Sequence, residues 1–93
     1  MTSYIEKVFD AVKAEIPDID PQLLPLYALL VIVGKGYIDM EDVHDAWAVW
    51  RHQTNPTHRF IIPFRELDDE VAMLDYIYMA KLKRANLKVV GIV

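Results

Sequence analysis

The stretch LLPLYALLVIV at residues 23–33 decides the fold class of this 93-residue chain. It is apolar all round, so we expect it to be buried on most of its sides. We predict a helix that begins properly at Pro25, because proline suits the first turn of a helix. The β-branched trio Val31, Ile32 and Val33 keeps a buried strand open as the alternative. Other elements must then surround this stretch.

A helix is predicted before it, over residues 4–16. Ser3-Tyr4-Ile5-Glu6 is typical of a capping box, in which the hydroxyl accepts the amide three residues on and the glutamate reaches back. Apolar residues follow at helical spacing, and they are Ile5, Val8, Phe9, Val12 and Ile16. Pro17 ends this helix, because the residue before a proline is pushed out of the helical region. Asp20-Pro21 then indicates the start of the central element.

A third helix is predicted after the central stretch. Gly34-Lys35-Gly36 ends that stretch and offers a glycine for a left-handed cap. Asp39 caps the next helix, whose positive end also favours the acidic residues Glu41 and Asp42. One face of this helix is apolar, through Val43, Ala46, Trp47 and Trp50. His44 and Arg51 share the edge of that face.

The rest of the chain predicts a turn at residues 55–58, a buried extended segment near residues 60–64 and a last helix. This helix opens at Asp68 or Asp69 and carries apolar residues at helical spacing, namely Val71, Leu74, Ile77, Tyr78 and Leu82. The apolar tail 87–93 either adds a short C-terminal strand or docks on the core. We therefore expect a mainly α, compact four-helix domain that occupies residues 1–93 as one unit.

Charge and composition exclude several classes of function. Net charge is −4, and residues 1–45 hold three lysines and nine acids (−6), whereas residues 46–93 hold seven basic residues and five acids (+2). This distribution argues against broad nucleic-acid binding but allows a local anion site in the second half. The chain has no cysteine, which fits a reducing, cytoplasmic location. The apolar run 23–33 is too short for a bilayer, which needs about 20 residues.

Metal sites are not expected. Residues 31–42 superficially resemble a calcium loop, but Val31, Val33 and Lys35 would occupy ligand positions, and calcium needs oxygen ligands. His44, His52 and His58 include no pair spaced four apart on one helix. The pattern predicts no metal and no cofactor.

DNA binding and catalysis are not expected either. A helix-turn-helix is disfavoured because its reading helix would begin with acids at residues 39–45, facing the phosphates. Hydroxyl nucleophiles are few, and Thr57 beside His58 is adjacency in sequence, which does not give the geometry of a triad. We expect no catalytic residue.

A candidate binding set lies in the second half of the chain. Aromatic and arginine side chains together can hold a planar, anionic ligand by stacking and bidentate hydrogen bonds. The set comprises Trp47, Trp50, Arg51, His58, Arg59 and Asp75. The competing interpretation is that both tryptophans are core and that the arginines pair with Glu66, Asp68 or Asp69.

Part of the chain resembles a known domain. The block VHDAW at residues 43–47, His58, the segment IPFREL at residues 62–67 and Asp75 followed by Tyr76 or Tyr78 resemble the ryanodine-receptor repeat (RyR) domain, over about residues 43–80. Over most of its length, the chain is more similar to an uncharacterised family of small actinobacterial and phage proteins. Those share the run LYALL at residues 26–30 and the VHDAW block.

The resemblance implies a mainly helical binding or regulatory module, with nucleotide-like ligands in some relatives and no catalytic residue. His44 and Trp47 would pack against Pro63-Phe64, and Asp75 would cap or brace the last helix. A ligand would then lie where His44, Arg51, His58 and Arg59 converge.

We therefore expect a non-enzymatic module of a bacterium or phage that recognises a small anionic or nucleotide-like ligand. The alternative is an interaction protein that pairs with itself or with a host protein through apolar surface, around Tyr27, Tyr37, Tyr76, Tyr78 or the tail 87–93. A hydrolase or transferase would instead need a pocket that holds a titratable pair with perturbed pKa values.

Overall fold

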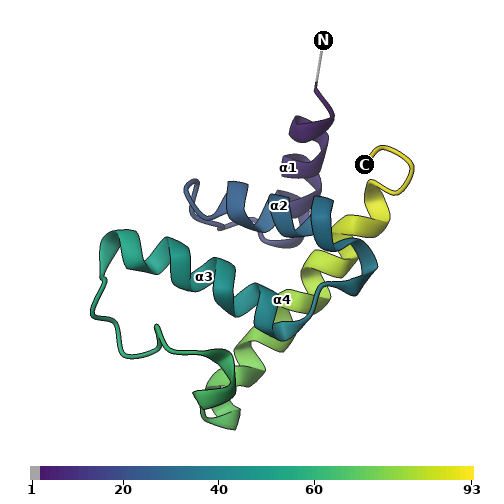
Figure 1. Cartoon of the computed structure of the whole chain (residues 1–93). Coiled ribbons are helices and arrows are strands. Elements are labelled where there is room, and N and C mark those ends of the chain that lie inside the picture. The colour runs from purple at the N-terminus through teal and green to yellow at the C-terminus, as the bar shows by residue number, and fades with distance from the viewer. Residues whose placement is uncertain (1–2) are drawn as a thin grey trace.

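The computed structural model describes residues 3–93, and its elements are helical (Figure 1). In chain order they are α1 (Tyr4–Glu15), α2 (Leu24–Gly34), the 3₁₀ turn η1 (Lys35–Tyr37), α3 (Met40–Thr54), the 3₁₀ turn η2 (Phe64–Glu66) and α4 (Asp69–Lys88). The described residues contain no strand, which confirms a mainly α four-helix fold and the helical alternative for residues 23–33.

Two of the helices begin where side-chain capping predicts. Ser3 and Glu6 form a capping box at α1, with 3.2 Å for each of the two hydrogen bonds. Asp39 and Asp42 form a second capping box at α3, where the Asp42 amide donates to Asp39 over 2.8 Å. These bonds satisfy amides that the first turn leaves without intrahelical partners. In α2, Pro25 stands in the first turn, as predicted.

The turn after α2 differs from the expected glycine cap. Lys35, and not a neighbouring glycine, adopts the positive φ of 52°. Gly34 is needed for a steric reason, because a Cβ there would lie 2.8 Å from Cγ1 of Ile38, a buried side chain. The pattern therefore placed the turn correctly but assigned the left-handed residue to the wrong position.

The core lies where α4 crosses α1 and α2. Figure 1 shows α4 as the long diagonal helix, with α1 and α2 beside its C-terminal half and α3 beside its N-terminal half. Buried side chains meet there from the three helices, and they include Val8, Val12, Val31, Leu82 and Val89. Asn86 is also buried, and its amide nitrogen donates to the Val31 carbonyl over 3.3 Å. This contact ties α4 to α2.

Two segments are less regular than the sequence indicates. Residues 60–64 form a turn and a bend that lead into η2, and Ile62 and Pro63 are exposed, so the expected buried extended segment is limited to local extended backbone at Pro63. The tail after α4 forms turns and not a strand. Its Val89 is buried and Val93 packs against the core, whereas Val90 stays exposed. The tail therefore docks on the core, which is the second of the two outcomes predicted for it.

No helix in the described part of the chain is both long and apolar enough to cross a membrane.

Candidate functional site

A cavity of about 440 Å³ opens between the α1–α2 connection, α3 and the N-terminal half of α4. Its size falls within the range of small-molecule sites, about 300 to 1,000 Å³. Five aromatic side chains line it, and they are Tyr27, Trp47, Trp50, Phe60 and Tyr78. Five polar side chains also line it, and they are Asp18, Asp20, His44, Arg51 and Asp75. The cavity is therefore an aromatic pocket with polar groups at defined positions.

A buried His–Asp pair forms one end of the cavity. His44 on α3 is 3% exposed, and its Nε2 lies 2.6 Å from the Ile62 carbonyl oxygen. Because a carbonyl only accepts, Nε2 donates this hydrogen bond. The other ring nitrogen, Nδ1, lies 3.7 Å from Oδ2 of Asp75 on α4. In the neutral ring Nδ1 is an acceptor, so two acceptors face each other at this end.

Burial shifts the pKa values of two groups at this end. Burial raises the pKa of Asp75, and the opposing influence of His44 lowers it less. Burial also raises the pKa of Tyr27, and the nearby carboxylate of Asp75 and phenol of Tyr78 act in the same direction. Tyr27 therefore stays a neutral phenol at ordinary pH.

Stacked rings form the α3 wall of the cavity. The rings of His44 and Trp47 stack, with centroids 5.7 Å apart, and His58 meets Trp47 edge-on at 5.3 Å. His58 is held in turn by the Phe60 amide, which donates to its Nδ1 over 3.1 Å. Residues 58–60 thereby hold the Trp47 ring in place from behind.

The other end of the cavity is formed by Trp50, Asp20 and Arg51. It lies about 10 Å from the His–Asp pair along α3, because Arg51 follows His44 by seven helical residues. The Trp50 indole donates to Asp20 over 3.3 Å. The Arg51 guanidinium lies over the Trp50 ring, 4.4 Å from its centroid. Its Nε is buried and has no hydrogen-bond partner in the described residues. A buried N–H without a partner is costly. Arg51 also lines the cavity, so its guanidinium is the group there to which a ligand acceptor could bind.

The charged side chains that line the cavity limit how much negative charge a ligand can carry. Asp18 and Asp20 line the same cavity as Arg51, and Asp75 adds a third carboxyl group at the far end. One guanidinium therefore faces several carboxyl groups, and a ligand with many negative charges would be repelled. A single acceptor group at Arg51 and hydrogen-bond donors at Asp75 would match this arrangement.

Five of the seven predicted site residues lie together in the cavity lining, and two do not. The lining contains His44, Trp47, Trp50, Arg51 and Asp75, whereas His58 lies outside it and meets Trp47 edge-on. Arg59 is absent from the lining, since its guanidinium lies over Phe60 at 4.7 Å. His44 and Arg51 lie at opposite ends of the cavity, and His58 and Arg59 lie outside its lining, so the four side chains do not converge on one point.

The expected packing around His44 is only partly matched. His44 contacts Phe64, at 6.1 Å between ring centroids, as the resemblance implies. Asp75 lies within the N-terminal half of α4, beside His44 of α3. It therefore does not cap the helix, whose N-cap is Asp68. The alternative in which Arg51 pairs with an acid of residues 66–69 is not found in the described residues.

Sequence reasoning missed Tyr27, Tyr78 and Asp20. Tyr27 lies in the apolar stretch of α2 and Tyr78 among the apolar residues of α4, so each was predicted to pack in the core or, in the alternative, to contact a partner. Their rings lie 6.3 Å apart across the two helices. Asp20 was interpreted only as a helix-start residue. It accepts the Gln22 amide over 2.7 Å in the turn before α2, but the N-cap of α2 is Leu23. For the two tyrosines, the available indication of a site was the hydroxyl group, a polar group on an otherwise apolar helix face.

Comparisons with known proteins give a family. No curated protein and no solved structure shows significant similarity to this chain. Residues 3–87 match a protein family described as a domain of unknown function (DUF7701). Because this match spans most of the 93 residues, the chain belongs to the DUF7701 family.

Proposed function

We propose that this protein is a non-enzymatic binding module whose cavity holds a small, flat, nucleotide-like ligand. The observation that carries the proposal is the aromatic cavity with acceptors at one end and an unpartnered Arg51 donor at the other. A heteroaromatic ring would stack against Trp47 or Trp50. Its amino or ring N–H groups would donate to Asp75 or to Nδ1 of His44, and one anionic group would accept from Arg51.

The charges of the lining favour ligands with a single anionic group. Asp18 and Asp20 lie in the lining with Arg51, so each added phosphate would meet more repulsion than attraction. We expect a nucleoside or nucleoside monophosphate to bind more tightly than the matching triphosphate.

The same geometry gives reasons against catalysis. The cavity holds a titratable pair, but Nε2 of His44 already donates to the Ile62 carbonyl, and Nδ1 lies 3.7 Å from Asp75, which is too far for a hydrogen bond. The lining includes no serine, threonine or lysine, and Tyr27 is held as a neutral phenol. A His–Asp pair that braces the loop before η2 against α3 and α4 explains this arrangement without a reaction.

The proposal includes the relationship to the RyR domain and a cytoplasmic setting in actinobacteria or their phages. Its support is that the residues shared with the RyR pattern contact one another: His44 stacks on Trp47, meets Phe64 and faces Asp75. The absence of cysteine fits a reducing compartment. A solved complex of any relative with a nucleotide in the equivalent cavity would strengthen this part.

Tryptophan fluorescence tests the binding proposal directly. The chain has two tryptophans and both line the cavity, so a stacked ligand should quench the emission of the protein. The titration would compare nucleosides, nucleoside monophosphates and triphosphates, with thermal unfolding measured in parallel. A ligand at about a hundred times its dissociation constant adds roughly 2.7 kcal/mol, which should raise the midpoint by about 10 °C or more in a domain this small.

Two arginines provide a matched pair of variants. Arg51→Ala should weaken the binding of a quenching ligand by about 10- to 100-fold, since hydrogen bonds to charged groups contribute about 1.5 to 3 kcal/mol. Arg59→Ala removes an arginine outside the lining and should leave affinity unchanged. If no compound of the panel quenches the tryptophans or shifts the midpoint, the proposal is wrong. Equal losses from both variants would argue for non-specific charge attraction.

A further inference from the structure

The outer face of α4 carries an apolar stripe that the rest of the fold leaves uncovered. Met73, Tyr76 and Ile77 are about half exposed, at 54%, 49% and 50%. Residues three and four apart on a helix share a face, so these three form one stripe, which continues to Arg84. The opposite face, with Asp75 and Leu82, is buried against the other helices. Contiguous exposed apolar surface of this kind marks interaction sites.

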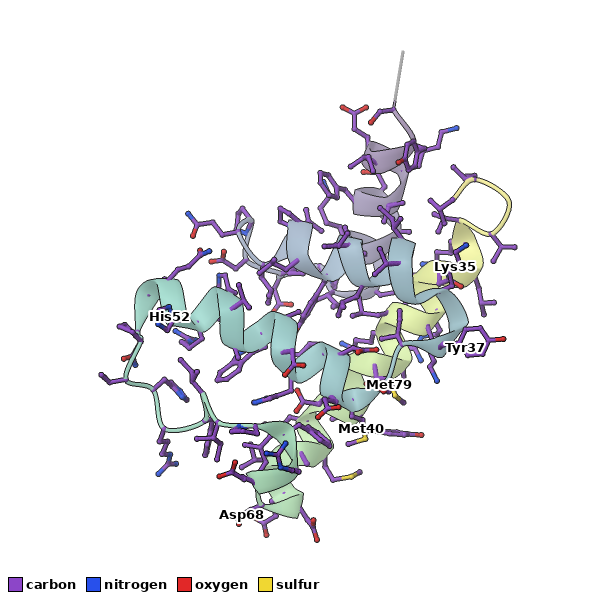
Figure 2. All side chains as sticks on the ribbon, in the orientation of Figure 1. Lys35, Tyr37, Met40, His52, Asp68 and Met79 are labelled. Atoms are coloured by element: carbon purple, nitrogen blue, oxygen red, sulfur yellow. The ribbon has the colours of Figure 1, made fainter. Side chains whose placement is uncertain are left out.

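Further apolar surface borders the stripe. Tyr37 is 90% exposed, and the η1 turn that carries it contacts α4. Figure 2 shows Tyr37 projecting outward from this turn, away from the body of the domain. Leu74 and Tyr78 belong to the adjacent face of α4 and line the cavity, so the stripe and the cavity are separate surfaces of one helix.

The two ends of α4 carry opposite charges. Three acids stand at its start, Asp68, Asp69 and Glu70, and the last two turns carry four cations, Lys81, Lys83, Arg84 and Lys88. Glu15 of α1 offsets only part of this positive charge, because its one carboxylate receives both Arg84, at 2.7 Å, and Lys88, at 3.0 Å. An excess of positive charge therefore remains at the C-terminal end, opposite in sign to the start.

We infer that this stripe binds a second copy of the chain, with the two α4 helices antiparallel about a two-fold axis at Ile77. Glu70 lies about two turns before Ile77, and Arg84 lies about two turns after it on the same face. An antiparallel pair thus brings Glu70 of each chain to Arg84 of its partner, and Ile77 meets Ile77 at the axis. A parallel pair would place acids against acids and cations against cations.

Self-complementarity is the reason to prefer a second copy over another partner. A two-fold interface uses the same patch twice, so a patch that is acidic at one end, apolar at its centre and basic at the other satisfies itself in antiparallel alignment. A nucleic acid would be repelled by the acidic end, and an acidic protein would leave that end unpaired. The pairing is independent of any ligand in the cavity.

Light scattering after size exclusion, with sedimentation equilibrium, tests the inference. At about 100 µM chain, above the micromolar constants of modest interfaces, the protein should be a dimer. Ile77→Lys puts two like charges at the axis and should weaken dimerisation by at least about tenfold. The matched control is Leu29→Lys on α2, where the leucine is similarly exposed at 52%, and it should leave the dimer intact. Circular dichroism would show that both variants keep their helices.

Disulfide trapping offers a second measurement, because the chain has no cysteine of its own. Ile77→Cys supplies one thiol at the axis, where the two chains approach most closely, and mild oxidation should link the dimer. Leu29→Cys should stay largely unlinked under the same conditions. A chain that is monomeric at about 100 µM would overturn the inference. A dimer that Ile77→Lys leaves intact and that Ile77→Cys does not link would also overturn it. A dimer that Leu29→Lys disrupts instead would assign the interface to another face.

Discussion

The two halves of α4 (Asp69–Lys88) lie in different surroundings although they belong to one continuous helix. The C-terminal half places Leu82 and Ala85 in a closed apolar core with α1 and α2, which Val89 of the tail completes. The N-terminal half instead places Asp75 beside His44 and presents Leu74 and Tyr78 to a cavity. The closed half is stabilised by apolar burial, and the open half by a few directional contacts.

This difference separates stability from the candidate site. The inward-facing apolar side chains of the closed half are fully buried, so each methyl group removed from them leaves a void. The open half borders empty space, and it faces α3 and the segment before η2, which are held by the hydrogen bond from His44 to Ile62 and by stacked rings. We expect substitutions in the closed half to unfold the domain, and substitutions in the open half to change binding and pH dependence.

The largest expected effect comes from the same substitution at two positions of α4. Leu82 is 0% exposed, and Leu82→Ala should lower the free energy of unfolding by about 2 to 5 kcal/mol. Leu74 is 55% exposed, and Leu74→Ala should cost less than about 1 kcal/mol. Urea unfolding followed by circular dichroism would measure both. Similar losses at the two positions would break the contrast between the halves.

Trp47→Ala should have an intermediate effect, a loss of about 1 to 3 kcal/mol, below the 3 to 5 kcal/mol typical of a fully buried tryptophan. The ring is only partly buried and lines the cavity, but it contacts His44 and His58. Chemical unfolding followed by circular dichroism gives the value. A loss above about 4 kcal/mol would assign Trp47 to the core, and one below about 1 kcal/mol would make it a surface residue.

Asp75 should give the open half a distinct pH dependence. Burial raises its pKa in the folded state, so its contribution to stability is fully present below its ordinary pKa and is lost as pH rises through the raised value. Relative to Asp75→Asn, the native chain should therefore gain stability as pH is lowered from neutral. Urea midpoints of both proteins across that interval test the sign.

The control for this test is Asp45→Asn, which changes an exposed aspartate of α3. Its stability should follow that of the native chain at every pH. If Asp75→Asn also follows the native chain, Asp75 is not coupled to folding as inferred. A midpoint difference of opposite sign would mean that the attraction of His44 outweighs burial.

The smallest expected effects on folding are those of the two arginine variants, Arg51→Ala and Arg59→Ala. The Arg51 guanidinium packs on Trp50 but has no ion-pair partner in the described residues, so the loss should stay within about 1 kcal/mol. Arg59→Ala, at an exposed position, should change unfolding by less than about 0.5 kcal/mol. Thermal unfolding without ligand measures both. A large loss from Arg51→Ala would make this residue structural and would weaken its use as a ligand contact.

Local patterns predicted the helices well because their causes lie within a few residues. The capping boxes at Ser3 and Asp39 each join residues three apart, and such bonds form whatever the rest of the chain does. The turn after α2 was harder to assign in detail. Lys35 takes the positive φ, and Gly34 is required because the side chain of Ile38, four residues later, fills the space beside it.

The candidate site was predictable only in part. His44, Trp47 and Arg51 share one face of α3, so their helical spacing placed them together correctly. The periodicity of the other helices could not show that Tyr27 and Tyr78 reach the same space, since each looks like a core residue in its own helix. Arg59 follows a turn, and no periodicity defines the direction of a side chain there.

Capping and apolar periodicity act over single turns, so the sequence alone predicted the four helices and the capped starts of α1 and α3. It did not predict that Leu74 and Ile77, which belong to the apolar pattern of α4, are about half exposed. Only the tertiary structure decided that Asp75 faces His44, that the Ile62 carbonyl, 18 residues along the chain, accepts from the same ring, and that a cavity remains between them. These contacts depend on the angles at which whole helices cross, and such angles follow from the packing of all side chains together.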